Sequence, residues 1–292
     1  MSPAPTTPVT RLGLQIPNFT FPGVSDADLF ETIAGIAITA DGNGFDSLWV
    51  MDHLYQIEMV APREEPMLEA YTLLGALSAR TRDIALGTMV TGVTYRNPAL
   101  LAKIVTTLDI ISAGRAILGL GAAWNDDEHA GYGYDFPTAG ERLDRLEEAL
   151  QLIPAMFTEQ APSFEGRHYR IQQVLNNPKP IRGGIPILIG GGGEKRTLRL
   201  VAQYGDACNL FGNPDEVRHK LDVLERHCAD VGRDPAEITK TILYTVRDPL
   251  QAADKIAAYT AVGVDGVVVN MTDVQNLDKV AATGETLRKV LS

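Results

Sequence analysis

The chain has few cysteines, an excess of acidic over basic residues and no apolar run long enough to cross a membrane. Its two cysteines, Cys208 and Cys228, do not have the close spacing of a zinc or redox motif, so we expect no metal site. Lys and Arg number 26 against 37 Asp and Glu, which gives a net charge of −11. Nucleic-acid binding requires clustered positive charge, and a membrane-spanning helix requires about 20 apolar residues. We therefore expect neither a nucleic-acid nor a membrane partner.

The N-terminal segment lacks the features of a secretory signal. Residues 1–10 contain three prolines and three threonines but no basic region followed by an apolar one. We interpret this segment as a loose, disordered tail and expect a cytoplasmic protein. Residues 11–292 are predicted to form a single domain, because a chain with 45% hydrophobic residues can supply a large core.

Eight short apolar runs predict the fold. Each is followed by small or polar residues and then by a segment of helical periodicity, and continuous apolar runs are typical of parallel strands covered on both faces. The runs are Leu12–Ile16, Ser47–Val50, Ile84–Val90, Ala116–Gly121, Pro186–Ile189, Ala207–Phe211, Thr239–Thr245 and Gly266–Asn270. Eight such units predict an α/β fold, a (β/α)8 TIM barrel. A doubly wound open sheet is the alternative, but no G-x-G-x-x-G motif follows the first run.

Two connections are too long to be simple turns. Tyr55–Glu69 follows the second predicted strand, and Thr158–Ile185 lies between the fourth predicted helix and the fifth predicted strand. Long connections in compact folds are usually lids or extra hairpins. Because Phe164–Ile171 has β-like composition, we predict an insertion with a short hairpin there rather than a second domain.

A run of four glycines follows the fifth predicted strand. Gly190, Gly191, Gly192 and Gly193 leave the backbone free to turn sharply and to point several N–H groups at one spot. A predicted helix follows, with basic residues in its first turns, and a helix N-terminus with bare amides suits a phosphate or another anion. The basic residues are Lys195, Arg196 and Arg199. The alternative is that the glycines only allow a tight turn.

Polar side chains follow the second and fourth predicted strands. Asp52 and His53 come directly after the second strand, where a neutral imidazole can exchange a proton and a carboxylate can hold a polar ring edge. A helix or turn cap and a buried structural histidine are the alternatives. After the fourth strand, Trp124 could pack on a ligand ring and Asn125 could bond its edge, while the acids at 126–128 are interpreted as helix-start charges.

Two further strand ends are built to let a flat ring approach the backbone. Met89, Val90 and Thr91 lie between glycines at the end of the third strand, and Gly121 removes a side chain at the end of the fourth. The strand ends carry no lysine suited to a Schiff base and no His-x-His pair or carboxylate cluster, which disfavours an aldolase or a metal-dependent hydrolase. A bound organic cofactor is then expected to supply the chemistry.

Taken together, these segments resemble the bacterial-luciferase-like superfamily of flavin and deazaflavin oxidoreductases, and most closely its coenzyme F420 branch. The resemblance extends from Leu12 to about Leu291 and implies a (β/α)8 barrel with the deazaflavin in its mouth. It implies a non-proline cis peptide at Met89-Val90 behind the ring and His53 next to the reacting ring carbon. The implied cofactor-binding residues are Asp52, Met89, Val90, Thr91, Gly121, Asn125, Gly190, Gly191, Gly192 and Gly193.

The chain departs from the F420-dependent sugar-phosphate dehydrogenases of that superfamily. Ala122 stands where those enzymes have a catalytic glutamate, and Ile57 stands where they have a tryptophan. We therefore expect a more apolar substrate site that includes Ile57, Trp124 and Phe211. The leading hypothesis is an F420-dependent oxidoreductase that moves a hydride between the deazaflavin C5 and a small organic substrate. An FMN-dependent luciferase-like monooxygenase and a non-catalytic F420- or flavin-binding protein are the alternatives, and a homodimer is expected from the resemblance.

Overall fold

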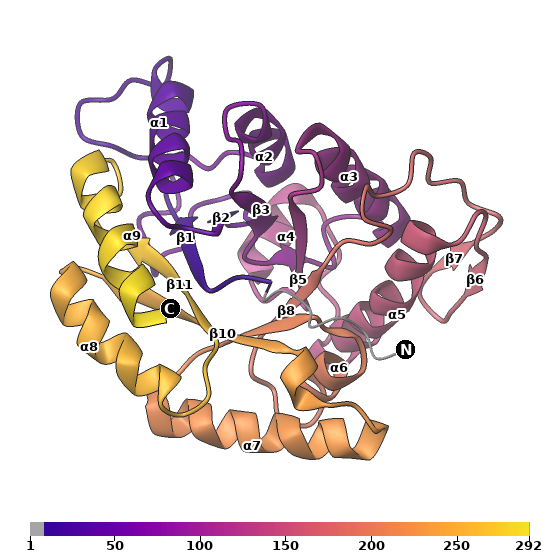
Figure 1. The fold of residues 1–292 in the computed structure, drawn as a ribbon. Coiled ribbons are helices and arrows are strands. Elements are labelled where there is room, and N and C mark those ends of the chain that lie inside the picture. The colour runs from indigo at the N-terminus through magenta and orange to yellow at the C-terminus, as the bar shows by residue number, and fades with distance from the viewer. Residues whose placement is uncertain (1–8, 292) are drawn as a thin grey trace.

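The computed structural model describes residues 9–291 and shows a closed parallel barrel surrounded by helices (Figure 1). Neighbouring strands pair in the order β3-β2-β1-β11-β10-β9-β8-β5, and a β3–β5 pairing closes the ring. The barrel strands are β1 (Leu12–Ile16), β2 (Ser47–Val50), β3 (Ala85–Thr88), β5 (Ala116–Gly121), β8 (Ile187–Gly190), β9 (Ala207–Leu210), β10 (Thr239–Val246) and β11 (Gly266–Met271). The predicted TIM barrel is confirmed.

Helices lie outside the barrel and cover its strands (Figure 1). Several begin at residues that the sequence marks as caps: Asn97 caps a helix with Pro98 in its first turn, and Asn213 forms a capping box with Glu216. The helices are α1 (Leu29–Gly42), α2 (Ala70–Ser78), α3 (Pro98–Ile111), α4 (Asp126–Tyr132), α5 (Ala139–Thr158), α6 (Thr197–Tyr204), α7 (Pro214–Val231), α8 (Pro249–Thr260) and α9 (Leu277–Leu291), with a 3-10 turn at Pro235–Glu237. Within residues 9–291, none of these helices is long and apolar enough to cross a membrane.

A buried tryptophan fills part of the barrel interior. Trp49 is fully buried, and its Nε1 donates to Ser47 Oγ over 2.7 Å. A Cβ at Gly13 would lie 2.6 Å from that nitrogen, and a Cβ at Gly87 would lie 2.8 Å from the indole ring. Glycine on both neighbouring strands therefore makes room for the indole, whose burial alone contributes roughly 3 kcal/mol.

The third predicted strand is shorter than its sequence suggests. Ile84–Val90 was predicted as one run, but β3 ends at Thr88 and the Met89-Val90 peptide is cis. The chain then pairs again with β5 through the short strand β4 (Thr91–Gly92). The cis peptide that the family resemblance implied is thus confirmed, and it places Met89 and Val90 at the mouth of the barrel.

The predicted hairpin in the insertion before the fifth barrel strand is also confirmed. β6 (Phe164–Glu165) and β7 (Arg170–Ile171) pair antiparallel, and Glu148 of α5 accepts backbone N–H groups from residues 167–169. The insertion is therefore held against α5 (Figure 1).

Most of the predicted disordered tail, residues 1–8, lies outside the described residues. At its end the structure differs from the prediction, because Thr10 is buried and its hydroxyl bonds Ser47 Oγ over 2.7 Å. Val9 also donates its backbone N–H to Thr239 Oγ1. Val9 and Thr10 therefore lie at the amino ends of β10 and β2, on the opposite end of the barrel from the mouth, and are not part of a loose tail.

Candidate active site at the barrel mouth

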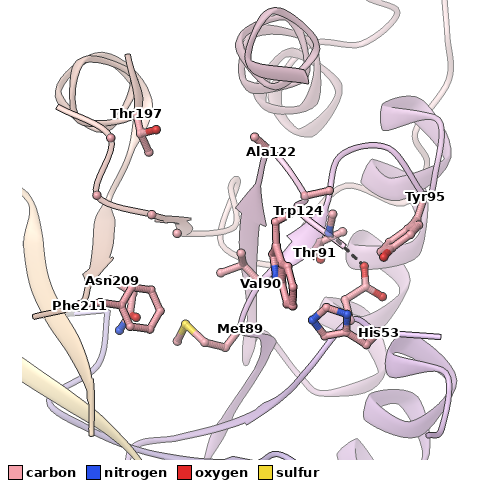
Figure 2. Close-up of a pocket in the computed structure, with 17 residues that line it drawn as sticks. His53, Met89, Val90, Thr91, Tyr95, Ala122, Trp124, Thr197, Asn209 and Phe211 are labelled. Carbon is pink, nitrogen blue, oxygen red and sulfur yellow. Dashed lines mark hydrogen bonds between the residues drawn. The ribbon is translucent and has the colours of Figure 1, made fainter. Parts of the chain in front are cut away.

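A cavity of about 320 Å³ opens where the carboxyl ends of β2, β3, β5, β8 and β9 converge (Figure 2). Small-molecule sites typically enclose about 300–1,000 Å³, so this one suits a small organic ligand. The cavity is lined by Asp52, His53, Met89, Val90, Thr91, Gly92, Tyr95, Ala122, Ala123, Trp124, Gly190, Gly191, Gly192, Gly193, Thr197, Asn209 and Phe211. No group of residues within the described part of the chain has the composition of a metal site.

The cavity brings together most of the site residues that the sequence predicts, but three of them do not line it. Asn125 caps α4, where its Oδ1 accepts from Asp127 N over 3.2 Å. Ile57 is buried in the connection after β2. Gly121 makes room for a protein side chain, because a Cβ there would lie 2.8 Å from Val90 Cγ2. The space that the sequence assigned to a ligand at Gly121 is therefore filled by Val90.

His53 is held by a buried carboxylate that the sequence analysis did not recognise as part of the site. Its Nδ1 lies 2.7 Å from Oε2 of Glu128, whose side chain is fully buried. An ionised carboxylate only accepts hydrogen bonds, so Nδ1 carries the hydrogen of the neutral imidazole. Nε2 then carries the lone pair, which is the form of histidine that takes up a proton.

Glu128 is fully engaged by hydrogen-bond donors. Oε1 accepts the backbone N–H groups of Leu54 and Tyr55, and Oε2 also accepts the Tyr95 hydroxyl over 2.8 Å. Burial raises the pKa of Glu128, but the hydrogen bond from His53, together with those from the Tyr55 and Tyr95 donors, outweighs burial. The pKa therefore lies below its ordinary value of 4.5, and Glu128 is ionised at neutral pH.

The sequence did contain a signal for Glu128. Residues 126–128 are three consecutive acids, and the sequence analysis interpreted all three as helix-start charges. Successive residues of a helix are rotated by about 100°, so Glu128 must face away from Asp126. In the structure Glu128 and the following His129 are buried, while Asp126 is exposed. Helical geometry shows that the three acids cannot all share one face, and the structure shows that Glu128 is the buried one.

Asp52 forms a second buried ion pair beside the cavity. Its oxygens lie 2.7 and 3.0 Å from the two terminal nitrogens of Arg96, and Gly92 N donates to it over 3.2 Å. Burial raises the pKa of Asp52, and the Arg96 guanidinium opposes that shift. Arg96 also pairs with Glu69 at 2.5 Å and lies over the Tyr71 ring. Asp52 lines the cavity, but both of its carboxylate oxygens are already bonded to protein donors, Arg96 and the backbone of β4.

The glycine quartet lines the cavity, and a cation that the sequence does not predict lies beside it. Arg196 and Arg199 pair with carboxylates of α5. Lys220 of α7 lies beside Gly192, since a Cβ at Gly192 would lie 3.8 Å from the Lys220 Cε. The Lys220 Nζ pairs with Glu194 at 2.5 Å. Sequence reasoning missed Lys220 because it approaches from the next helix of the barrel rather than from the one after the glycines.

Two exposed aromatic side chains flank the cavity. Figure 2 shows Trp124 next to His53 on one side and Phe211 on the other, with Met89 between them. The Trp124 and His53 rings meet edge to face with centroids 5.6 Å apart. Trp124 is 54% exposed and Phe211 58% exposed, and apolar rings this open at a cavity indicate a binding surface.

Comparison with known proteins places this geometry in a family. The family model described as luciferase-like monooxygenase matches residues 10–288. An F420-dependent glucose-6-phosphate dehydrogenase of Kineococcus radiotolerans is 32% identical over 232 residues, which cover 76% of this chain and 66% of that protein. An uncharacterized protein of Mycobacterium tuberculosis is 27% identical over 274 residues, covering 89% of this chain and 94% of that protein.

Solved structures show the same fold at low sequence identity. An F420-dependent secondary alcohol dehydrogenase in complex with an F420-acetone adduct has a TM-score of 0.79 at 19% identity, covering 97% of this chain and 99% of that chain. EDTA monooxygenase from Chelativorans sp. BNC1 has a TM-score of 0.81 at 15% identity, covering 97% and 93%. Because the family model covers nearly the whole chain, the resemblance inferred from the sequence is confirmed, and the chain is an enzyme of the luciferase-like monooxygenase family.

Proposed function

We propose that this enzyme is a coenzyme F420-dependent oxidoreductase that transfers a hydride between the deazaflavin C5 and a small organic substrate. The observation that carries the proposal is the His53–Glu128 pair at one end of a cavity whose other end is the glycine quartet. Relatives at 30–32% identity that are named F420-dependent glucose-6-phosphate dehydrogenases support F420 as the cofactor.

The described residues fit such a cofactor. Gly191 has a φ of +112°, a conformation that suits glycine, and a Cβ at Gly192 would have no atom nearer than 3.8 Å. The Gly191 N–H bonds the backbone carbonyl of Asn209, so the amides of Gly192 and Gly193 would be the ones to receive an anionic tail. Met89 and Val90 would support the ring, and Asp52 and Thr91 would lie at its edge. When bound, the deazaflavin supplies two-electron transfer at C5.

The chain's own residues then bind the substrate and move its proton. Nε2 of His53 would accept the proton of a substrate hydroxyl during oxidation, and the protonated ring would return it to a carbonyl oxygen during reduction. Glu128 fixes the ring orientation through Nδ1. Trp124 and Phe211 would hold an apolar substrate and exclude water, and Ala122 at the wall leaves no carboxylate for a sugar phosphate. Proton transfer by a positioned group is worth on the order of 10²–10⁴ in rate.

A titration of the apoprotein tests the cofactor. We expect coenzyme F420 to bind at least a hundredfold more tightly than FMN, which corresponds to roughly 2.7 kcal/mol. Reduced F420 should then be reoxidised by small ketones, or oxidised F420 reduced by the matching alcohols, as seen from the cofactor absorbance. Binding of F420 with no absorbance change across such a panel would favour the non-catalytic cofactor-binding alternative.

An FMN-dependent monooxygenase is the second candidate function. It is favoured by structural neighbours such as the EDTA monooxygenase, whose fold matches as well as those of the F420 enzymes. A preference for FMN in the titration, with oxygen consumption by the reduced complex, would replace the leading proposal. A homodimer and a cytoplasmic location stay predictions, and light scattering of the purified protein would measure the first.

A further inference from the structure

One buried polar atom in the cavity has no protein partner. Asn209 is the third residue of β9 and pairs in register with Gly190. The backbone carbonyl of Asn209 accepts from Gly191 N over 3.3 Å. Its side chain is 1% exposed and lines the cavity beside Phe211 and Met89 (Figure 2). Within the described residues, its Oδ1 has no hydrogen-bond partner. Buried polar atoms are nearly always satisfied, so an orphaned acceptor at a cavity indicates a missing donor.

The hydrogen-bond network fixes which end of the amide is free. Asn209 Nδ2 lies 2.9 Å from Thr241 Oγ1, and that hydroxyl lies 2.8 Å from the Cys208 carbonyl oxygen. A carbonyl can only accept, so the single hydroxyl proton of Thr241 goes to Cys208. Thr241 Oγ1 must then accept from Asn209, which requires Nδ2 on that side. Oδ1 is consequently the atom left for the cavity.

The surroundings give this oxygen no partner within the described residues. Leu188 and Ala207, on β8 and β9 below Asn209, are apolar and buried. The amide is anchored through Nδ2 alone, and its unpaired oxygen raises the free energy of the empty protein. A leucine would fill a similar volume without that cost. The feature that leucine lacks is an acceptor next to the cavity that Asn209 lines.

We propose that Asn209 determines ligand specificity by accepting, through Oδ1, a hydrogen bond from a neutral N–H or O–H donor of the bound cofactor. The inference rests on the proposed function, because the deazaflavin cofactor carries such donors in two places: an imide N–H and a hydroxyl on the ring, and several hydroxyls on the chain that joins the ring to the phosphate. Both sources suit the position of Asn209, which lies next to the glycine quartet and close to Met89.

Binding of coenzyme F420 to variants of the apoprotein tests the proposal. Asn209→Leu should weaken binding by about 5- to 100-fold, since the cofactor donor loses its acceptor. Thr241→Val keeps the size of the side chain but releases Nδ2, so binding should weaken although Asn209 is intact. The matched control is Thr239→Val on the same strand, whose Oγ1 serves Val9 at the opposite end of the barrel and should not affect binding.

A second readout separates this role from a structural one. Asn209→Leu should leave the melting temperature of the apoprotein close to that of the wild type, because removal of the unpaired Oδ1 offsets loss of the Nδ2–Thr241 hydrogen bond. A ring analogue with a methyl group at N10 in place of the polyol chain identifies the donor. If the Asn209→Leu penalty persists with this analogue, the donor is on the ring; if it disappears, a chain hydroxyl is the donor.

The two proposals fail differently. An Asn209→Leu protein that binds F420 within twofold of wild type overturns the role of Asn209 and leaves the proposed function standing. A loss of binding accompanied by a large drop in apoprotein melting temperature, with unchanged binding by Thr241→Val, also overturns it. A wild-type protein that takes up neither F420 nor FMN ends both proposals.

Discussion

Glu128→Gln is expected to move the proton of His53 from Nδ1 to Nε2. The carboxamide of glutamine keeps an acceptor oxygen for the backbone N–H groups of Leu54 and Tyr55, which Oε1 of Glu128 serves in the wild type. Its NH2 group then takes the place of Oε2, 2.7 Å from His53 Nδ1. A donor at that position requires Nδ1 to accept, so the neutral ring must carry its hydrogen on Nε2.

The size of the effect follows from the contacts that change. The Tyr95 hydroxyl, 2.8 Å from Oε2, can rotate and accept from the amide, and its own hydrogen then turns toward the cavity that Tyr95 lines. The substitution exchanges charge-assisted bonds for neutral ones, which should cost about 1–2 kcal/mol of folding free energy. With the lone pair of Nε2 removed from the cavity, kcat should fall on the order of 10²–10³. Binding of coenzyme F420 should stay within twofold, because Glu128 does not line the cavity.

Nitrogen-15 NMR of the histidine side chains measures the proton position directly and needs no substrate. The chain has five histidines, and the signals of His53 are assigned by their loss in a His53→Gln variant. The matched control is Asp127→Asn, the neighbouring acid on α4, whose side chain is 55% exposed and pairs with Arg63. Unchanged His53 shifts in Glu128→Gln, or wild-type turnover by that variant, would refute the reasoning.

The same pair gives a pH dependence with a definite sign. The pKa of Glu128 is lower in the folded protein than its ordinary value of 4.5, so the folded state binds this proton less readily than the unfolded state. The stabilisation from Glu128 is therefore complete above that value and is lost as the pH falls through the lowered, folded-state pKa. Urea titrations should show the stability advantage of wild type over Glu128→Gln at pH 7 shrinking below pH 4.5.

Other parts of the site give predictions that need only stability or labelling measurements. Gly190→Ala should lower the free energy of unfolding by about 1–3 kcal/mol, because the new Cβ would lie 2.8 Å from Val90 Cγ2. Asp52→Asn should lower it by about 3 kcal/mol by leaving Arg96 buried with a weakened partner, as measured in urea. Burial raises the pKa of Cys208 to about 12, so thiol reagents at pH 8 should label this residue only after denaturation.

Each of these outcomes has a control in the chain. Gly140→Ala, near the start of α5, should leave stability unchanged, since the nearest atom to its Cβ would lie 3.9 Å away. Wild-type stability of Gly190→Ala would show that Val90 adjusts without strain. Rapid labelling of the native protein would contradict the burial of both cysteines, Cys208 and Cys228.

The strands were predictable because their signal is local. Each buried parallel strand is a short apolar run, and all eight barrel strands lie within or near the predicted runs. The glycine quartet, Asp52 and His53 were found for the same reason, since in this fold a residue that follows a strand faces the mouth. The third predicted strand was too long by Met89 and Val90. Apolar side chains continue there, but β3 ends at Thr88 and the Met89-Val90 peptide is cis.

The contacts that organise the site were not predictable from local pattern. Glu128 and His53 are separated by 75 residues, and Arg96 and Asp52 by 44. Neither spacing corresponds to a helix or strand repeat, so only the closure of the barrel brings the partners together. Gly121 was misinterpreted for a related reason, because a glycine that makes room for Val90 has the same sequence signature as one that makes room for a ligand.

The ion pairs also explain how an acidic chain can present a nearly neutral cavity. The carboxylates of Asp52 and Glu128 are both satisfied by protein donors, so neither offers a free charge to a ligand. The residues that line the cavity include His53, whose Nε2 can accept, Asn209, whose Oδ1 has no partner within the described residues, and the glycine quartet. Two acceptors and a set of amides suit a ligand that offers neutral donors along its body and an anion at one end. The ring cofactor with a phosphorylated chain that we propose would meet that requirement.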